Sequence, residues 1–444
     1  MLNLQKITEP IPLNNLQGRF FDGRIFSSPL ERKLSIKRGQ IEGFKDPESK
    51  SDLIVPSKTL IIPGGIDLHV HGREVYDILP DKEGDQTYKE DSYTLSLALA
   101  HGGATTAMCM PNLANNVCSE DEYKKQLAWI NNEQPHRKKP ISELLMYTLI
   151  KPGSEPQVPQ AMYKLMWNTF GPTNFNSDEE VRETLKKYED CWVTAHCETI
   201  SGMVQGEGLA HHEQRPKQAA IDAVRLFLDC AKKYRFHPHI AHISSAEEVE
   251  LVKEARRRGV PATCEITPQA TMLAHDTFTA KTGFPTIMCQ QNPPLRSEAE
   301  RQELLSQIKD IDIFATDHAP HTYEEKMRGM SGMPQADSAG QVYLELVSED
   351  IISLRRYIEM RSEIPGNILH EHQSIRGGKF KPLYDASFTL VTLGKPSNIT
   401  RGDVLSKCRW TPYNEIEFRN TIEGVVIKGT LYTAATLKKL KESV

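Results

Sequence analysis

The chain has 444 residues, of which 39% are hydrophobic and 25% charged, with a formal net charge of −5. This length exceeds one ordinary core of about 100–200 residues and suits two domains or one large α/β barrel with an appendage. This negative net charge gives no support for binding to nucleic acid or to an anionic membrane. No run reaches the ~18 apolar residues of a membrane-crossing helix. The eight cysteines contain no CxxC pair, so we expect a cytoplasmic protein with reduced thiols.

The order of predicted elements indicates the fold class. Residues 1–60 alternate polar and apolar positions between turns, as short β-strands do. Residues 61–380 alternate short apolar runs with amphipathic stretches, and helices are expected over 91–100, 178–187, 217–233 and 245–258. The eight apolar runs are TLIIPGGIDLHV, ATTAMCM, ELLMYTLI, AMYKLMW, CWVTAH, HPHIAHI, PATCEI and DIFATDH. This pattern predicts an α/β protein with a (β/α)8 TIM-type barrel. Residues 381–444 return to β texture, so both chain ends should form one small β-rich domain.

Metal-binding residue types gather at the ends of the predicted strands. They are His69, His71, His196, His242 and Asp317. The carboxyl ends of barrel strands form one mouth, so residues far apart in the sequence should converge there. A lone HxH pair is equally compatible with histidines that only satisfy hydrogen bonds, but the whole set favours metal binding. Imidazole and carboxylate suit Zn²⁺, and this many ligands predicts two ions about 3.5–4 Å apart.

Lys164 lies inside the apolar run AMYKLMW, where an unpaired lysine is unusual. One interpretation is a lysine whose ammonium group extends to the solvent. The other is that burial lowers the pKa of the amine. A neutral amine can add CO₂ to become a carbamate, and this anion could bridge two cations. The sequence leaves both interpretations open.

The ordered motifs resemble a known family. They are GGIDLHVHGRE, GGATTAMCMPN, YKLMWNTF, AHCE, RPKQAAIDAVR, HIAHISS, ATCEITP, NPPLRS, ATDHAPHTYEEK and the closing WTPYNE and GVVIKGTLY. Over most of residues 60–430 the chain resembles the dihydroorotases of the cyclic amidohydrolase superfamily. It departs from their usual pattern at Gly72, Gln269, Gln290 and the segment MPQADS. None of these departures removes a candidate ligand.

The resemblance implies a role for each matching position. His69 and His71 would bind the first metal and His196 and His242 the second, with carbamylated Lys164 as the bridge and Asp317 beside the first metal. A hydroxide between the two divalent ions would attack a ring amide, with Asp317 as the general acid and base. In reverse, this reaction cyclises N-carbamoyl-L-aspartate to L-dihydroorotate in pyrimidine biosynthesis.

The resemblance also implies the substrate contacts. Arg73, Asn112 and His321 would hold the substrate carboxylate, and Asn292 would contact the ring. Arginine suits the first task because its planar fork matches a carboxylate bidentately. Thr169 and Phe170 follow the Lys164 strand, where they belong either to a mobile substrate loop or to an ordinary polar loop. We expect His211 and His212 to be solvated and His101 to be a capping or surface residue.

Two alternatives differ in function. Sister cyclic amidohydrolases, such as dihydropyrimidinases, hydantoinases and allantoinases, share the metal set but act on rings without this carboxylate. A catalytically silent relative could instead serve as a scaffold for aspartate transcarbamoylase, although such a protein is expected to have lost metal ligands. Every ligand position is filled here, which favours an active enzyme.

A homodimer and association with aspartate transcarbamoylase are the expected assemblies.

Overall fold

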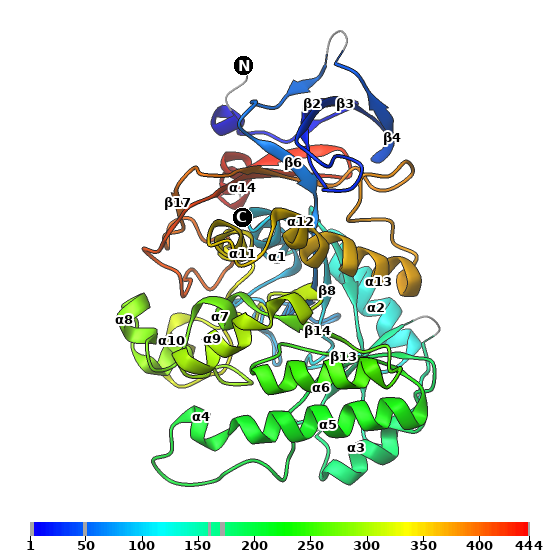
Figure 1. Ribbon diagram of the computed structural model, residues 1–444, viewed down its shortest axis with the longest axis vertical. Coiled ribbons are helices and arrows are strands. Elements are labelled where there is room, and N and C mark those ends of the chain that lie inside the picture. Colours follow the sequence, from blue (N-terminus) through cyan, green and yellow to red (C-terminus); the bar gives the residue numbers. More distant parts are fainter. Residues whose placement is uncertain (1–3, 48–50, 159–160, 169–173, 443–444) are drawn as a thin grey trace.

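The computed structural model describes residues 4–47, 51–158, 161–168 and 174–442. Figure 1 shows a body of parallel strands surrounded by helices, with a mostly antiparallel sheet at one end built from both ends of the chain. The predicted fold class, a TIM-type barrel with a small β-rich domain, is confirmed. Among the described residues, no helix is both long and apolar enough to cross a membrane.

The barrel strands follow one another in chain order and pair in parallel. They are β7 (Gly65–Val70), β8 (Ala104–Cys109), β9 (Glu143–Met146) continued by β10 (Thr148–Ile150), β11 (Met162–Met166), β12 (Trp192–His196), β13 (His237–Ile240), β14 (Thr263–Ile266) and β15 (Ile313–Phe314). A parallel bridge between Val70 and His318 joins the last strand to the first. Nearly every strand residue is buried, as expected when helices cover a parallel sheet.

Helices connect these strands and pack around them. In chain order they are α1 (Ser92–His101), α2 (Glu120–Asn131), α3 (Asp178–Leu185), α4 (His211–Gln214), α5 (Lys217–Tyr234), α6 (Ala246–Arg257), α7 (Pro268–Met272), α8 (Phe278–Thr282), α9 (Glu298–Ser306), α10 (Tyr323–Met327), α11 (Ala339–Ser348), α12 (Leu354–Ile358) and α13 (Ile364–Gln373). Capping fixes several helix starts: the side chain of Asp91, for example, accepts the backbone N–H of Thr94 at the start of α1.

The end sheet joins the two ends of the chain. Its strands run in the order β1 (Ile11–Pro12), β20 (Thr430–Thr433), β19 (Thr421–Ile427), β16 (Phe388–Thr392), β6 (Leu60–Pro63), β2 (Asn15–Phe20), β3 (Leu30–Lys37) and β4 (Gln40–Lys45), with β5 (Leu53–Ile54) beside β2. A separate pair, β17 (Ser397–Asn398) and β18 (Glu417–Phe418), and the final helix α14 (Ala434–Glu442) complete this region. The phenylalanines Phe20, Phe26, Phe380 and Phe388 form much of its core.

The first predicted strand proves to be two strands in two sheets. β6 pairs with β16 in the end sheet, whereas β7 pairs with β8 in the barrel. The chain passes between the two sheets at Gly64, where an added Cβ would lie 2.7 Å from Oγ1 of Thr105. Only glycine permits so close an approach of the two sheets. The four predicted helices correspond to α1, α3, α5 and α6, with ends that differ by one or two residues.

Candidate active site

A cavity of about 180 Å3 opens at the carboxyl ends of the barrel strands. It is lined by ten of the predicted site residues, namely His69, His71, Arg73, Asn112, Lys164, His196, His242, Asn292, Asp317 and His321. The structure therefore brings together residues that lie up to 252 positions apart, from His69 to His321. The remaining two predicted residues, Thr169 and Phe170, lie outside the described residues.

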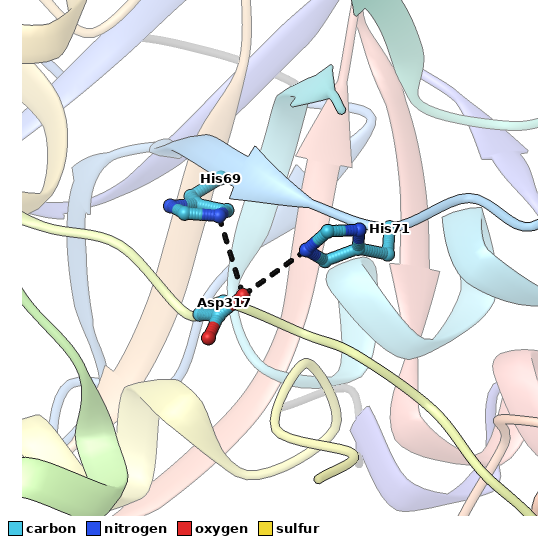
Figure 2. Close-up of side chains that lie close together, drawn as sticks. All are labelled: His69, His71 and Asp317. Atoms are coloured by element: carbon cyan, nitrogen blue, oxygen red, sulfur yellow. Dashed lines mark ion pairs between the residues drawn. The ribbon is translucent and has the colours of Figure 1, made fainter. Parts of the chain in front are cut away.

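His69, His71 and Asp317 form the tightest group in the cavity (Figure 2). Oδ1 of Asp317 lies 3.2 Å from Nε2 of His69 and 3.2 Å from Nε2 of His71. The barrel closure creates this group, because the backbone N–H of His71 donates to the carbonyl of His318 at 2.8 Å. Asp317 has a left-handed backbone (φ 45°), a conformation that aspartate adopts more readily than most residues.

His196 and His242 form a second group beside the first. Nδ1 of His196 lies 3.0 Å from Nε2 of His242, and the rings of His242 and His69 are 5.2 Å apart. His242 also has a left-handed backbone, with φ 37°. Burial lowers the pKa of both histidines, and it likewise lowers the pKa of His71 to about 4. Neutral imidazoles retain the lone pair that a metal requires.

Lys164 is fully buried on β11, which excludes an ammonium group that extends to the solvent. Its Nζ has no hydrogen-bond partner among the described residues. Burial lowers the pKa of the amine to about 8, although the carboxylates of Glu265 and Asp317 oppose this shift. The neutral amine is therefore more accessible at neutral pH than in an ordinary lysine.

Buried carboxylates behind the histidines were missed in the sequence. Oε1 of Glu265 on β14 lies 2.5 Å from Nδ1 of His69, and Oε2 lies 3.0 Å from Nε2 of His239. Glu198 accepts a hydrogen bond from Nε2 of His196 at 2.9 Å and is paired with Arg215. The available signal was one acidic residue inside each of the motifs ATCEITP and AHCE. Such carboxylates fix the tautomer and the orientation of a histidine ligand.

The predicted carboxylate-binding residues lie together at another part of the cavity wall. Arg73 reaches it through a left-handed backbone (φ 56°) beyond the end of β7, and not as part of the strand. Its Nη2 donates to Nε2 of His321 at 3.3 Å, and its buried Nε has no hydrogen-bond partner in the described part of the chain. Asn112 accepts a hydrogen bond from Nδ1 of His71 at 3.0 Å. Burial lowers the pKa of Arg73 to about 10, so the guanidinium remains charged at neutral pH.

The structure adds to one prediction about other histidines and corrects a second. His211 is partly exposed, but its Nε2 also donates to the carbonyl of Gln291 at 2.9 Å and to Oδ1 of Asn292 at 3.0 Å. His101 is not a surface residue: it is buried at the end of α1, with Nδ1 3.1 Å from the carbonyl of Asp337. Both contacts join segments far apart in the sequence, which a local pattern does not disclose. His212 is partly exposed and stacks on His275.

Comparison with known proteins agrees with this arrangement. Residues 60–432 match the amidohydrolase family. The chain belongs to the amidohydrolase family. This match confirms the expectation of a metal-dependent cyclic amide hydrolase, because members of the family use divalent metals and the cluster of His69, His71 and Asp317 is present.

Curated relatives extend over nearly the whole chain. A protein named dihydroorotase from Pyrococcus abyssi is 29% identical over 422 residues, covering 94% of each chain. Another from Fusobacterium nucleatum is 31% identical over 406 residues, covering 86% of this chain and 89% of the relative. These matches confirm the resemblance to dihydroorotases within the amidohydrolase superfamily.

Solved structures share the fold at lower identity. An L-hydantoinase (dihydropyrimidinase) from Arthrobacter aurescens superposes with a TM-score of 0.80 at 18% identity, covering 95% of this chain and 96% of that chain. A dihydropyrimidinase from Brevibacillus agri gives 0.77 at 16% identity, covering 96% and 95%. These likenesses support the barrel fold and do not decide between substrate rings.

Proposed function

We propose that this protein is a dihydroorotase, which interconverts L-dihydroorotate and N-carbamoyl-L-aspartate in pyrimidine biosynthesis. The proposal rests on the position of the Arg73 guanidinium and on its lack of an ion-pair partner among the described residues. This guanidinium lines the same cavity as the histidine groups, and no carboxylate of the described residues forms an ion pair with it. A partly buried guanidinium without an ion-pair partner in the cavity wall is suited to bind an anionic group, and the exocyclic carboxylate of dihydroorotate is such a group.

The residues present fit two divalent cations, with Zn²⁺ as the proposed ion. His69, His71 and Asp317 would hold one cation, and His196 and His242 the other. Two adjacent cations also require a negatively charged group between them. Nζ of Lys164 has no hydrogen-bond partner among the described residues, and its carbamate would supply this anion. When bound, the cations would activate water and polarise the ring carbonyl.

Asp317 is the proposed proton carrier. Its pKa lies below the ordinary value: burial raises it, but the neighbouring His69, His71 and His242 more than offset this effect. The carboxylate is therefore ionised at neutral pH and can accept the proton of the attacking water. In the ring-opening direction it would return that proton to the leaving ring nitrogen. Oδ1 lies 3.2 Å from Nε2 of both His69 and His71, which places the carboxylate beside the position of the first proposed cation.

Steady-state kinetics of the wild-type enzyme on three rings tests the proposal. Dihydroorotate should be opened with a kcat/KM about 10⁴-fold higher than dihydrouracil or hydantoin, since a site built for a polar group discriminates strongly against analogues that lack it. Comparable turnover of dihydrouracil or hydantoin would assign the chain to the sister enzymes, and turnover of no ring would support the scaffold alternative.

Arg73→Met should lower kcat/KM for dihydroorotate by about 10²–10⁴-fold, because two charge-assisted hydrogen bonds of roughly 1.5–3 kcal/mol each are lost. Metal content should stay unchanged, and the preference over dihydrouracil should shrink. Arg73→Lys is the matched control for charge, and it should recover only part of the loss because an ammonium lacks the planar fork. An Arg73→Met enzyme with wild-type preference would refute this role of Arg73.

Glu265→Gln should weaken metal retention by about 10–100-fold, the usual effect of removing the carboxylate behind a histidine ligand. The substitution keeps the volume of a fully buried side chain and removes its charge. Competition with a chelator, followed by metal analysis, measures the change. Glu345→Gln is a suitable control, because Glu345 is a buried carboxylate paired with Arg419 instead of a cavity residue. Equal retention in both variants would show that Glu265 has only a packing role.

The proposal includes the cytoplasm as location and a homodimer, with association with aspartate transcarbamoylase, as assembly. The unpaired state of the cysteines supports a reducing compartment. Sedimentation of the purified protein, alone and with the transcarbamoylase, tests the assemblies.

A further inference from the structure

His211 lies on α4, a short helix that no sequence motif connects with the cavity. Its Nε2 is placed between two oxygen atoms, the backbone carbonyl of Gln291 at 2.9 Å and Oδ1 of Asn292 at 3.0 Å. Asn292 lines the cavity, whereas His211 does not. The imidazole therefore stands behind a residue that faces the substrate.

The contact with Gln291 determines which way the Asn292 amide points. A backbone carbonyl only accepts hydrogen bonds, so Nε2 of His211 must carry the hydrogen. The atom of Asn292 that faces the same N–H must then be an acceptor, which is the oxygen and not the nitrogen. Nδ2 of Asn292 is consequently the end of the amide left for the cavity. No hydrogen bond from Nδ2 is found within the part of the chain that the structure describes.

Arg215 anchors the C-terminal end of α4, the helix that carries His211. The N–H of Arg215, directly after α4, donates to the carbonyl of His211 at 3.2 Å. The Arg215 side chain pairs with Glu198, which contacts His196, and the Arg215 carbonyl accepts from Nη1 of Arg296 at 3.1 Å. These buried contacts fix the position of α4, so His211 can hold Asn292 in one orientation.

We propose that His211 is a specificity-determining positioning residue, which makes Asn292 a hydrogen-bond donor to a carbonyl oxygen of the substrate ring. The proposal deepens the proposed function and rests on it for the identity of the ring. It defines a substrate class: the ring position that meets Asn292 bears an acceptor oxygen. A ring with an amino group at that position would place a hydrogen-bond donor opposite the Asn292 N–H, which is also a donor, and would bind poorly.

Three variants test this role by steady-state kinetics with dihydroorotate. His211→Phe keeps the ring shape and loses the N–H, so KM should rise about tenfold, the effect of one oriented hydrogen bond, with kcat and metal content nearly unchanged. His211→Gln retains a side-chain N–H donor and should stay within about threefold of the wild-type KM. His212→Phe is the matched control at the next position, because a phenyl ring preserves the stacking on His275. It should behave as wild type.

A double variant separates positioning from a general structural effect. If His211 acts through Asn292, His211→Phe combined with Asn292→Ala should raise KM no further than Asn292→Ala alone. Additive effects, a normal KM in His211→Phe, or failure of His211→Gln to restore KM would each overturn the proposal. If the wild type opens only rings without the carboxylate, the proposed function fails, and the same variants measured on those rings still decide the role of His211.

Discussion

Lys164→Ala should abolish the second metal position and lower kcat/KM by at least about 10³-fold, because cation stabilisation of the reaction contributes several kcal/mol. Lys164 is completely buried, and its Nζ has no hydrogen-bond partner among the described residues, so the side chain has no evident structural task as an amine. As a carbamate it would supply the shared anion that the two histidine groups lack. Metal analysis and kinetics of the purified variant measure both effects.

A short carboxylic acid added in solution should restore part of the metal content and activity of Lys164→Ala, since it would occupy the space of the missing carbamate. The chain offers a second buried lysine as control. Lys326 donates to the carbonyls of Gln290 and Met330 at 2.6 and 2.7 Å, so it has a structural task that Lys164 lacks. Lys326→Met should retain both metals. A Lys164→Ala enzyme with normal turnover would show that the lysine is a packing residue.

Asp317→Asn should keep the fold and bind metal at least partly, but lose proton transfer. Removing a general acid and base typically lowers kcat by about 10²–10⁴-fold, and this is the expected range. The substitution is nearly isosteric and leaves an oxygen able to face His69 and His71. Pre-steady-state kinetics in both reaction directions should show the defect in the chemical step and not in binding. An effect smaller than about tenfold would exclude this role.

The barrel was predictable from the sequence because its strands are buried on both faces. Buried parallel strands appear as continuous apolar runs, and a lysine or histidine in such a run is anomalous enough to indicate the site. The passage of the chain from the end sheet to the barrel at Gly64 could not be predicted, because a continuous apolar run does not indicate which sheet each part of it joins. β6 and β7 therefore appeared as one strand.

The supporting residues could not be predicted because their roles depend on distant partners. Glu265 is 196 residues from His69, and His211 is 81 residues from Asn292. A single acidic residue in a strand, or a histidine in a loop, has many possible partners until the fold brings one within hydrogen-bonding distance. Arg73 lies beyond the end of β7 and reaches the cavity through a left-handed backbone, which the sequence does not disclose.

Anomalous diffraction at the zinc absorption edge, from crystals of enzyme prepared with zinc and bicarbonate, is the most direct test of the proposed centre. The expected result is two anomalous peaks about 3.5–4 Å apart, one beside His69, His71 and Asp317 and the other beside His196 and His242. Extra density should extend from Nζ of Lys164 and contact both peaks. A single peak with unmodified Lys164, in a preparation that has full dihydroorotase activity, would contradict the two-metal centre.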